Sequence, residues 1–541
     1  MMQKPTSKTY RYLYLPIIAL FFLAFTDCAK KGRPSGGLKD SIPPVIVRSI
    51  PENFTTSFDE SEIRISFDEY IKLKDVSKEL LISPPLKYAP IITPTSVSKQ
   101  LRIKILDTLK EHTTYSFNFG NSIVDNNEGN IFPNFKYVFS TGTYIDSLTL
   151  KGSVADALLA APQHPSTVML YEITEEYSDS LIFTEKPSYI TTTQGESTNF
   201  EFTNLKEGTY QLIALKETTP NYTFQPEQDK IAYYSTPITL PTDSMFELKL
   251  FKEIPDFKAS RPKLESKNRI SIGYKGNGDS LSATIITKMA EGFDYLLLKE
   301  RNRDTLNLWF KPEITSDSIE LVTVNKSIRD TTVIKFRELY ADSLQVSALN
   351  DKRISVVDSF KLATNTPLLS IDREKITVFD NDTISQQFTV ALNSKNNTAS
   401  ISFDKIEEKS YTITTLKGAL TDYYGNVNDS IAYKQQVQPA SEFATLQLNL
   451  ENASKFPLLI ELVNEKFEVK QSKHLSQNEP IIFKYIKPGK YFVRIIYDDN
   501  NNKKWDTGNF LSRTLPERVV YYPTKIELRG NWSWNESFKL D

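Results

Sequence analysis

The residues best suited to hold a metal ion lie in one short segment near the C-terminus. Oxygen-bearing residues fall there at positions 1, 3, 5, 7 and 9 of an EF-hand-like loop: Asp498, Asn500, Asn502, Lys504 (through its carbonyl) and Asp506. Oxygen ligands at this spacing can surround a hard cation such as Ca²⁺. Lys503 stands where such a loop needs glycine, and Asn509 stands where it needs glutamate. Because Asn and Asp also favour turns on their own, a Ca²⁺ site and an Asn/Asp-rich hairpin loop both remain open.

Two tryptophans near the C-terminus have the spacing of a sugar-binding surface. Trp532 and Trp534 are two residues apart, so in a strand both rings project from the same face. Rings exposed on one face could stack on a carbohydrate. A buried face explains the same spacing, so a glycan-binding surface and a core position are both open.

Catalytic patterns are sparse. The three histidines, His112, His164 and His474, fall in separate predicted modules and lack the spacing of a metal-binding pair. The sequence contains no nucleophile elbow, zinc ligand set or phosphate-binding loop. Carboxylates are numerous enough that a glycosidase pair stays open, and with it hydrolysis of an envelope polymer. We predict a protein that is not an enzyme and that has no cofactor other than the Ca²⁺ considered above.

The N-terminus has the pattern of an export signal. Basic residues precede an apolar run from Leu13 to Phe25, which is shorter than the roughly 20 residues needed to span a bilayer. The only cysteine, Cys28, follows this run. It resembles the lipid acceptor of bacterial lipoproteins, although Asp27 stands where those usually carry a small residue. The resemblance implies a signal peptide at 1–27 and lipidation of Cys28; the alternative is an uncleaved anchor with an incidental cysteine.

Composition and periodicity predict an all-β protein. The chain has 32 Phe and 27 Tyr residues, which favour strands. Apolar residues recur at every second position, as in Ile63, Ile65 and Phe67, or Leu101 and Ile103. Lys and Arg total 65 against 67 Asp and Glu, so there is no basic excess to bind nucleic acid. With Cys28 assigned to lipid, packed cores rather than disulfides must stabilise the domains.

Two internal repeats divide the chain. Phe202–Tyr210 aligns without gaps to Phe483–Tyr491, and the alignment continues to Phe224 against Trp505. A looser repeat pairs Tyr115 and the turn after Asp125 with Tyr411 and the turn after Asp422. The predicted order is a flexible tether (28–42), module A (43–142), module B (143–255), an undefined middle module (256–365), module A′ (366–440) and module B′ (441–541).

Module A resembles a known family. The segments Pro34–Asp40, Pro43-Pro44 and Pro51–Asn53 resemble the start of Bacteroidota lipoproteins that carry a bacterial Ig-like domain of the S-layer (SbsA) type. The turn Asp125–Asn130 and the segment Tyr137–Gly142 are similar to the closing strand of that domain. The Gly-x-Tyr segments of modules B and B′ resemble those of prealbumin-like or Cna-B-like sandwiches. These resemblances imply an Ig-like fold for A, and an adhesive, spacer or scaffold role without chemistry.

The sequence therefore predicts tandem Ig-like and prealbumin-like β-sandwiches behind a lipoprotein signal. We expect a lipid-anchored protein of the outer membrane, facing the periplasm or the cell surface, in which about five sandwiches form a rod. Its expected function is non-catalytic, as a spacer, adhesion module or scaffold in the cell envelope. Its expected partners are the membrane and an unknown envelope protein or glycan. Binding of a surface glycan through Trp532 and Trp534 is the alternative.

Overall fold

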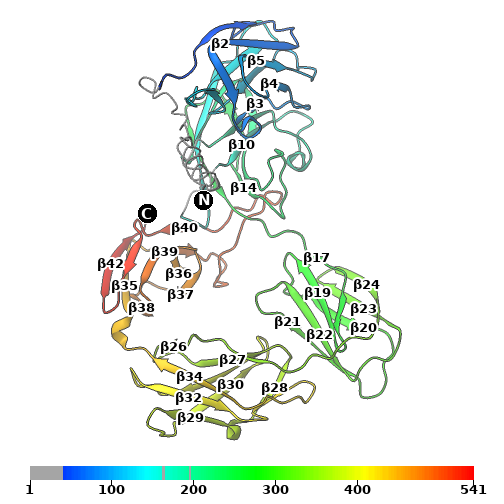
Figure 1. Ribbon diagram of the computed structural model, residues 1–541, viewed down its shortest axis with the longest axis vertical. Helices are drawn as coiled ribbons and strands as arrows, with labels where there is room; N and C mark the ends of the chain where they lie inside the picture. The colour runs from blue at the N-terminus through cyan, green and yellow to red at the C-terminus, as the bar shows by residue number, and fades with distance from the viewer. Residues whose placement is uncertain (1–39, 161–164, 194–196, 541) are drawn as a thin grey trace, which may run out of the picture. The chain divides into compact units, whose positions relative to one another are not determined.

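The computed structural model describes residues 40–160, 165–193 and 197–540. The expected signal peptide, Cys28, most of the expected tether and His164 lie outside these ranges. Strands make up nearly all of the regular structure in Figure 1, and the chain is all-β, as predicted. Within the described ranges, none of the helices has the length and apolar character needed to cross a bilayer.

The chain divides into two compact units. The first comprises Met1–Leu80, Lys87–Leu109 and Phe117–Phe139, and holds most of module A. The second comprises Leu81–Leu86, Lys110–Ser116 and Ser140–Asp541, and holds the remaining modules.

Module A is built around a five-stranded sheet and a core rich in aromatic residues. Its elements are β1 (Ile46–Ile50), β2 (Glu62–Leu73), α2 (Val76–Glu79), β3 (Leu81–Ser83), β4 (Ile91–Thr93), β5 (Ser98–Lys104), β6 (Thr114–Asn118), β7 (Ile123–Asp125) and β8 (Lys136–Ser140). The sheet has the order β1-β2-β5-β4, with β7 also paired to β2. The expected alternation holds in β2, where Ile63, Ile65 and Phe67 are buried. In β6 it fails, because Thr114 and Ser116 are buried as well.

Modules B and B′ have the same topology, which accounts for their sequence repeat. Module B contains β9 (Leu148–Asp156), β10 (Thr167–Glu172), η1 (Asp179–Phe183), β11 (Tyr189–Thr192), β12 (Asn199–Leu205), β13 (Gly208–Lys216), β14 (Lys230–Tyr233), β15 (Ile238–Leu240) and β16 (Met245–Leu250). Module B′ contains η3 (Ala440–Glu442), β35 (Ala444–Glu451), β36 (Leu458–Asn464), β37 (Val469–Leu475), β38 (Ile481–Ile486), β39 (Gly489–Tyr497), β40 (Val519–Tyr521), β41 (Ile526–Leu528) and β42 (Ser533–Lys539). The sheet orders β12-β9-β16 and β11-β10-β13-β14 in B correspond to β38-β35-β42 and β37-β36-β39-β40 in B′.

The Gly-x-Tyr motif that revealed this repeat closes a tight turn in both modules. The hydroxyl of Tyr210 donates to the carbonyl of Lys206 at 3.0 Å, and Tyr491 does the same to Lys487 at 2.7 Å. A Cβ atom at Gly208 would lie only 3.2 Å from the Tyr210 hydroxyl oxygen. Glycine therefore leaves the room that the tyrosine ring needs as it folds back over the turn.

The middle module is a pair of antiparallel sheets. Its strands are β17 (Lys258–Ala259), β18 (Lys263–Ser266), β19 (Arg269–Lys275), β20 (Ser282–Ile285), β21 (Asp294–Lys299), β22 (Thr305–Lys311), β23 (Ser318–Asn325) and β24 (Ile328–Lys335). One sheet has the order β17-β19-β22-β21, with β18 also on β19, and the other has the order β20-β23-β24. Leu308, Phe310 and Leu321 are among the residues buried between them.

Module A′ begins earlier than expected. Its elements are β25 (Val346–Ala348), β26 (Arg353–Ile354), β27 (Phe360–Thr364), β28 (Leu368–Ile371), η2 (Arg373–Lys375), β29 (Ile376–Asp380), β30 (Phe388–Asn393), β31 (Thr398–Phe403), β32 (Ser410–Thr415), β33 (Leu420–Asp422) and β34 (Ile431–Val437). The sheet β25-β27-β31-β30 joins residues 346–364 to strands beyond 366. The expected boundary between 365 and 366 therefore cuts through this sheet, whose order matches β1-β2-β5-β4 of module A.

Candidate functional site

The predicted metal loop is closed by a buried carboxylate. The side chain of Asp498 is fully buried, and its two oxygens accept the backbone N–H groups of Asn502 and Lys503, each at 2.9 Å. Its Oδ2 also lies 3.1 Å from Nε2 of His474 on β37, which belongs to the same sheet as β39. Asp498 therefore links the two ends of this turn and also connects the turn to the sheet that contains β37.

A second carboxylate closes the far end of the loop. Glu517 accepts the N–H groups of Asp499 and Asp506, both at 2.9 Å. Burial raises the pKa of Glu517, and the charges of Asp506 and Asp498 act in the same direction, while the two N–H groups oppose them. The side-chain amides of Asn500 and Asn502 donate to Oδ2 of Asp506.

This bonding is that of an Asn/Asp-rich hairpin loop. Four of the five predicted ligands, Asp498, Asn500, Asn502 and Asp506, lie together as expected, but loop N–H groups or amides bond to their oxygens. Among the described residues, no group of three or more His, Cys, Asp or Glu side chains is arranged to hold a metal ion. Ca²⁺ binding at Asp498, Asn500, Asn502, Lys504 and Asp506 stays a prediction.

The same loop extends into module B. Phe510 is fully buried in a cluster made mostly of module B residues, and its ring lies 5.2 Å from that of Tyr233 in an edge-to-face contact. The N–H of Phe510 donates to the carboxylate of Glu253, and the hydroxyl of Thr507 donates to the carbonyl of Lys252 at 2.6 Å. Phe510 thus completes a core that module B cannot close alone.

An arginine that is 34% exposed lies beside this insertion. Arg513 pairs with Asp179 of η1 and donates to Oε1 of the fully buried Gln211 at 3.0 Å. Its guanidinium also lies 4.8 Å from the Phe510 ring centroid, within cation–π distance. The arginine neutralises the carboxylate and covers the inserted ring at the same time.

The contact between modules B and B′ continues on β39 and β40. Arg494 is 5% exposed, is bonded to Glu461 at 2.7 Å, and donates to the carbonyl of Leu158 at 3.2 Å. The hydroxyl of Tyr521 donates to the same carbonyl. The last module therefore contacts the second through these two side chains as well.

The two tryptophans share a face, as their spacing predicted. The rings of Trp532 and Trp534 are stacked, with centroids 6.0 Å apart and an angle of 15°. Trp532 is 43% exposed, and the Arg529 guanidinium lies 5.2 Å from its ring centroid. Trp534 is half-buried against the B′ core, and its Nε1 has no hydrogen-bond partner in the described structure.

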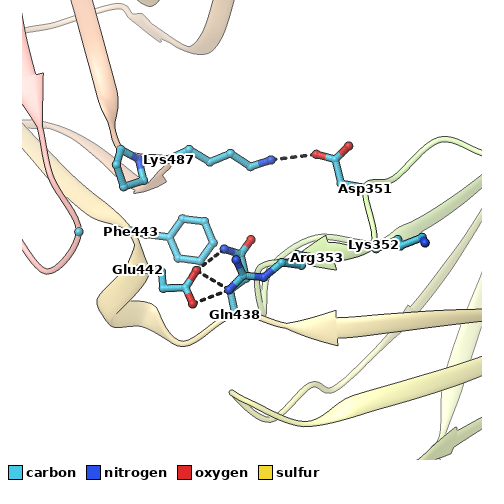
Figure 2. Close-up of a pocket in the computed structure, with 9 residues that line it drawn as sticks. Asp351, Lys352, Arg353, Gln438, Glu442, Phe443 and Lys487 are labelled. Atoms are coloured by element: carbon cyan, nitrogen blue, oxygen red, sulfur yellow. Dashed lines mark hydrogen bonds and ion pairs between the residues drawn. The ribbon is translucent and has the colours of Figure 1, made fainter.

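A cavity of about 500 Å³ lies where module A′ meets B′ (Figure 2). Two ion pairs cross this junction: Arg353 with Glu442, and Lys487 with Asp351 at 3.0 Å. All four side chains are more than a third exposed. The charged groups of the cavity are largely paired with one another, so it offers little free charge to a ligand.

Sequence reasoning missed the docking residues Phe510, Arg513 and Glu253. One signal could have pointed to them. The loop of B′ is longer than its counterpart in B, and the additional stretch carries three large apolar residues, Phe510, Leu511 and Leu515. A loop in water has little need of apolar residues, so the stretch indicates burial against another surface, which holds for Phe510 and not for the two leucines.

Comparison with known proteins identifies one domain. Residues 40–141 match the family model of the bacterial Ig-like domain, which agrees with the resemblance seen in module A. A search of curated protein sequences found no match.

Solved structures give only distant similarities. The chain is 11% identical to surface layer protein SbsC, domains 1–6, with a TM-score of 0.15 over 90% of this chain and 67% of that one. It is 9% identical to the Bacillus anthracis TIE protein, with a TM-score of 0.14 over 94% and 76% of the two chains. For the major pilin subunit BcpA of Bacillus cereus the values are 8%, 0.13, 73% and 99%. At these TM-scores, the similarities carry no information about function.

Proposed function

We propose that this chain is a non-catalytic scaffold of the bacterial cell envelope, held to the outer membrane by a lipid on Cys28. The observation that carries the proposal is the insertion of Phe510 from module B′ into the core of module B. A chain whose last module closes the core of its second holds both at a fixed distance and orientation. That property suits a protein that positions a partner, and it has no use in a flexible tether.

The test is in-cell cross-linking of a tagged full chain, followed by mass spectrometry of the recovered material. We expect one recurrent envelope protein with the wild type, and its loss with Phe510→Asp, which places a charge in the junction core. Leu511→Asp is the matched control, because Leu511 is the next residue and is 56% exposed. Recovery of polysaccharide without a recurrent protein would argue against a scaffold.

The anchor is tested separately by cell fractionation. Cys28→Ser should move the protein from the membrane to the soluble fraction, because two or more acyl chains are needed for stable anchoring and the substitution removes them. A Cys28→Ser protein that stays with the membrane would refute lipidation, whether or not a partner is found.

Glycan binding by the C-terminal face is the second candidate, favoured by the stacked and partly exposed ring of Trp532. On a glycan array, saturable binding that is lost in both Trp532→Ala and Trp534→Ala would support it. Binding unchanged by these substitutions would assign the pair to the packing of B′.

A further inference from the structure

A second cavity lies between the middle module and module A′, and it is lined mainly by polar side chains. Its volume is about 310 Å³, at the small end of the ~300–1,000 Å³ range of ligand pockets. Strands β19 and β22 and the turn after β21 form one wall, and the loops around Thr364 and Asn396 of A′ form the other. A cavity of this size fits a ligand of one or two sugar rings.

The wall of the middle module is covered by A′ rather than by solvent. The ring of Trp309 on β22 lies 6.3 Å from that of Tyr424, whose hydroxyl donates to the carbonyl of Asn268 at 2.8 Å. Lys311 donates to the carbonyl of Tyr423 at 2.9 Å. These contacts bury the outer face of β22 and leave the cavity enclosed on both sides.

Asn307 is the side chain that points to a ligand. It sits in the middle of β22, lines the cavity and is only 5% exposed. Among the described residues, its side-chain amide nitrogen and oxygen have no hydrogen-bond partner. Neither atom is among the polar atoms closed to solvent, so both stay open to a ligand in the cavity. An amide held here offers a donor and an acceptor together, which is the arrangement that recognises a hydroxyl group.

The charges of the lining favour an anionic ligand. Lys299 is paired with Asp279 at 3.1 Å, Glu300 with Arg303 at 3.3 Å, and Arg269 with Asp342 at 3.3 Å. Among the described lining residues, Arg301, an exposed residue of the turn after β21, is the charged side chain left without an ion pair or hydrogen bond. A guanidinium in this position matches one carboxylate, to which it can donate two parallel hydrogen bonds.

We propose that this cavity binds an acidic sugar, with Arg301 on the carboxylate and Asn307 on a ring hydroxyl. Asn302 and Asn396 at the rim add further amides for hydroxyl groups. The site is distinct from the tryptophan pair of B′ and independent of the scaffold function. A ligand bound in this cavity would contact both the middle module and A′ and so stabilise their junction.

The test is titration of the purified full chain with di-galacturonate, monitored by isothermal titration calorimetry. Thermal unfolding with and without the disaccharide is the second measurement. Neutral digalactose serves as the matched ligand without the carboxylates. We expect saturable binding of the acidic disaccharide and at least a tenfold weaker response to the neutral one. Arg301→Ala should weaken binding of the acidic sugar at least tenfold, and Arg329→Ala, an exposed arginine of β24 outside the cavity, should not.

Asn307→Leu separates binding from folding. Leucine has nearly the shape of asparagine and breaks no side-chain hydrogen bond of the described structure, so the ligand-free protein should melt at the same or a higher temperature. Binding of the acidic sugar should be lost. A lower melting temperature without ligand would mean that Asn307 has a structural partner, and would overturn the proposal. So would binding that survives Asn307→Leu, equal binding of both disaccharides, or no saturable binding of either.

Discussion

Modules B and B′ carry the same loop in two lengths. In B, Glu217 accepts the N–H groups of Asn221 and Tyr222, and Asp229 accepts those of Thr218 and Gln225. In B′, Asp498 and Glu517 accept the N–H groups at the four equivalent positions. Each loop is therefore fixed by one carboxylate at its start and one at its end, which gives the acidic residues at these positions a structural role.

The two loops differ in the stretch between the last shared N–H group, that of Gln225 or Asp506, and the second carboxylate. The two carboxylates stand at 217 and 229 in B but at 498 and 517 in B′, so the second loop is seven residues longer. The additional residues include Gly508, Phe510 and Arg513, which together make the contact with B. A Cβ atom at Gly508 would lie 2.9 Å from the ring of Phe251, so only glycine allows this approach. A self-contained loop has thus become a docking element through its length, while the carboxylates that fix its base are retained.

The largest loss of stability is expected from Phe510→Ala, which removes the docking residue that distinguishes the loop of B′ from that of B. The ring is fully buried against Tyr233 and Phe251, so its loss should lower the free energy of unfolding by about 3–5 kcal/mol. It should also expose β14 to hydrogen exchange while B′ stays folded. Both are measured by denaturant unfolding and hydrogen–deuterium exchange of the full chain.

Phe224→Ala is the matched control in module B. Phe224 is 2% exposed and belongs to the same cluster, so its removal should destabilise by a similar amount. It should do so without raising exchange in the B′ loop. If Phe510→Ala left exchange in β14 unchanged, the loop would not be a docking element.

A smaller effect comes from the carboxylates at the start of each loop. Asp498→Ala removes a fully buried acceptor and leaves His474 and two N–H groups without it, which should destabilise by about 3 kcal/mol. Glu217→Ala removes the equivalent bonds from a half-buried position and should cost about 1–2 kcal/mol. Urea unfolding of both variants measures the difference. Equal losses of unfolding free energy would show that the first carboxylate stabilises the longer loop no more than the shorter one.

The pH dependence of the junction should be set in part by Glu253. Burial raises the pKa of this carboxyl; the N–H of Phe510 lowers it in part, and the charge of Asp256 raises it further. An acid whose pKa is raised on folding adds most stability below its ordinary value of 4.5, and this stability is lost as the pH rises through the folded pKa. Relative to Glu253→Gln, the wild type should therefore lose stability as the pH rises from acid to neutral.

The comparison with Glu253→Gln isolates one group, because all other titrating residues are common to the two proteins. Glu207→Gln, at an exposed position of the same module, is the control and should follow the wild type. Parallel stability curves for the wild type and Glu253→Gln would mean that this carboxyl does not couple the junction to pH.

Much of this architecture follows from the sequence because it depends on local patterns. Alternation predicted the strands, and the Gly-x-Tyr motif predicted a repeat whose two copies have the same sheet order. The boundary of A′ was misplaced because the motif that revealed it, Tyr411 and Asp422, lies late in the module, whereas β25 and β27 carry no such mark.

The sites were harder to predict because they depend on partners distant in the chain. Spacing identified the oxygens of the Asp498–Asp506 loop, yet spacing is the same whether an oxygen faces a cation or a backbone N–H. Phe510 acquires its role only from Tyr233 and Glu253, more than 250 residues earlier. Asn307 is likewise one polar residue in an apolar strand until A′ covers it.

The smallest effect is expected at the other contact of B′, its junction with A′. There Lys487 and Asp351 form an ion pair at 3.0 Å, but their side chains are 63% and 78% exposed. Water and salt screen such a pair, so a double-mutant cycle of Lys487→Ala and Asp351→Ala should give a coupling energy below about 1 kcal/mol. High salt should abolish it. The bond from Tyr491 to the Lys487 carbonyl survives the substitution, because it involves only the backbone of Lys487. A salt-independent coupling above ~2 kcal/mol would mean that this junction contributes to stability on the scale of the Phe510 contact. A weak coupling would mean that module B′ is held in place by the buried Phe510 ring rather than by surface charge.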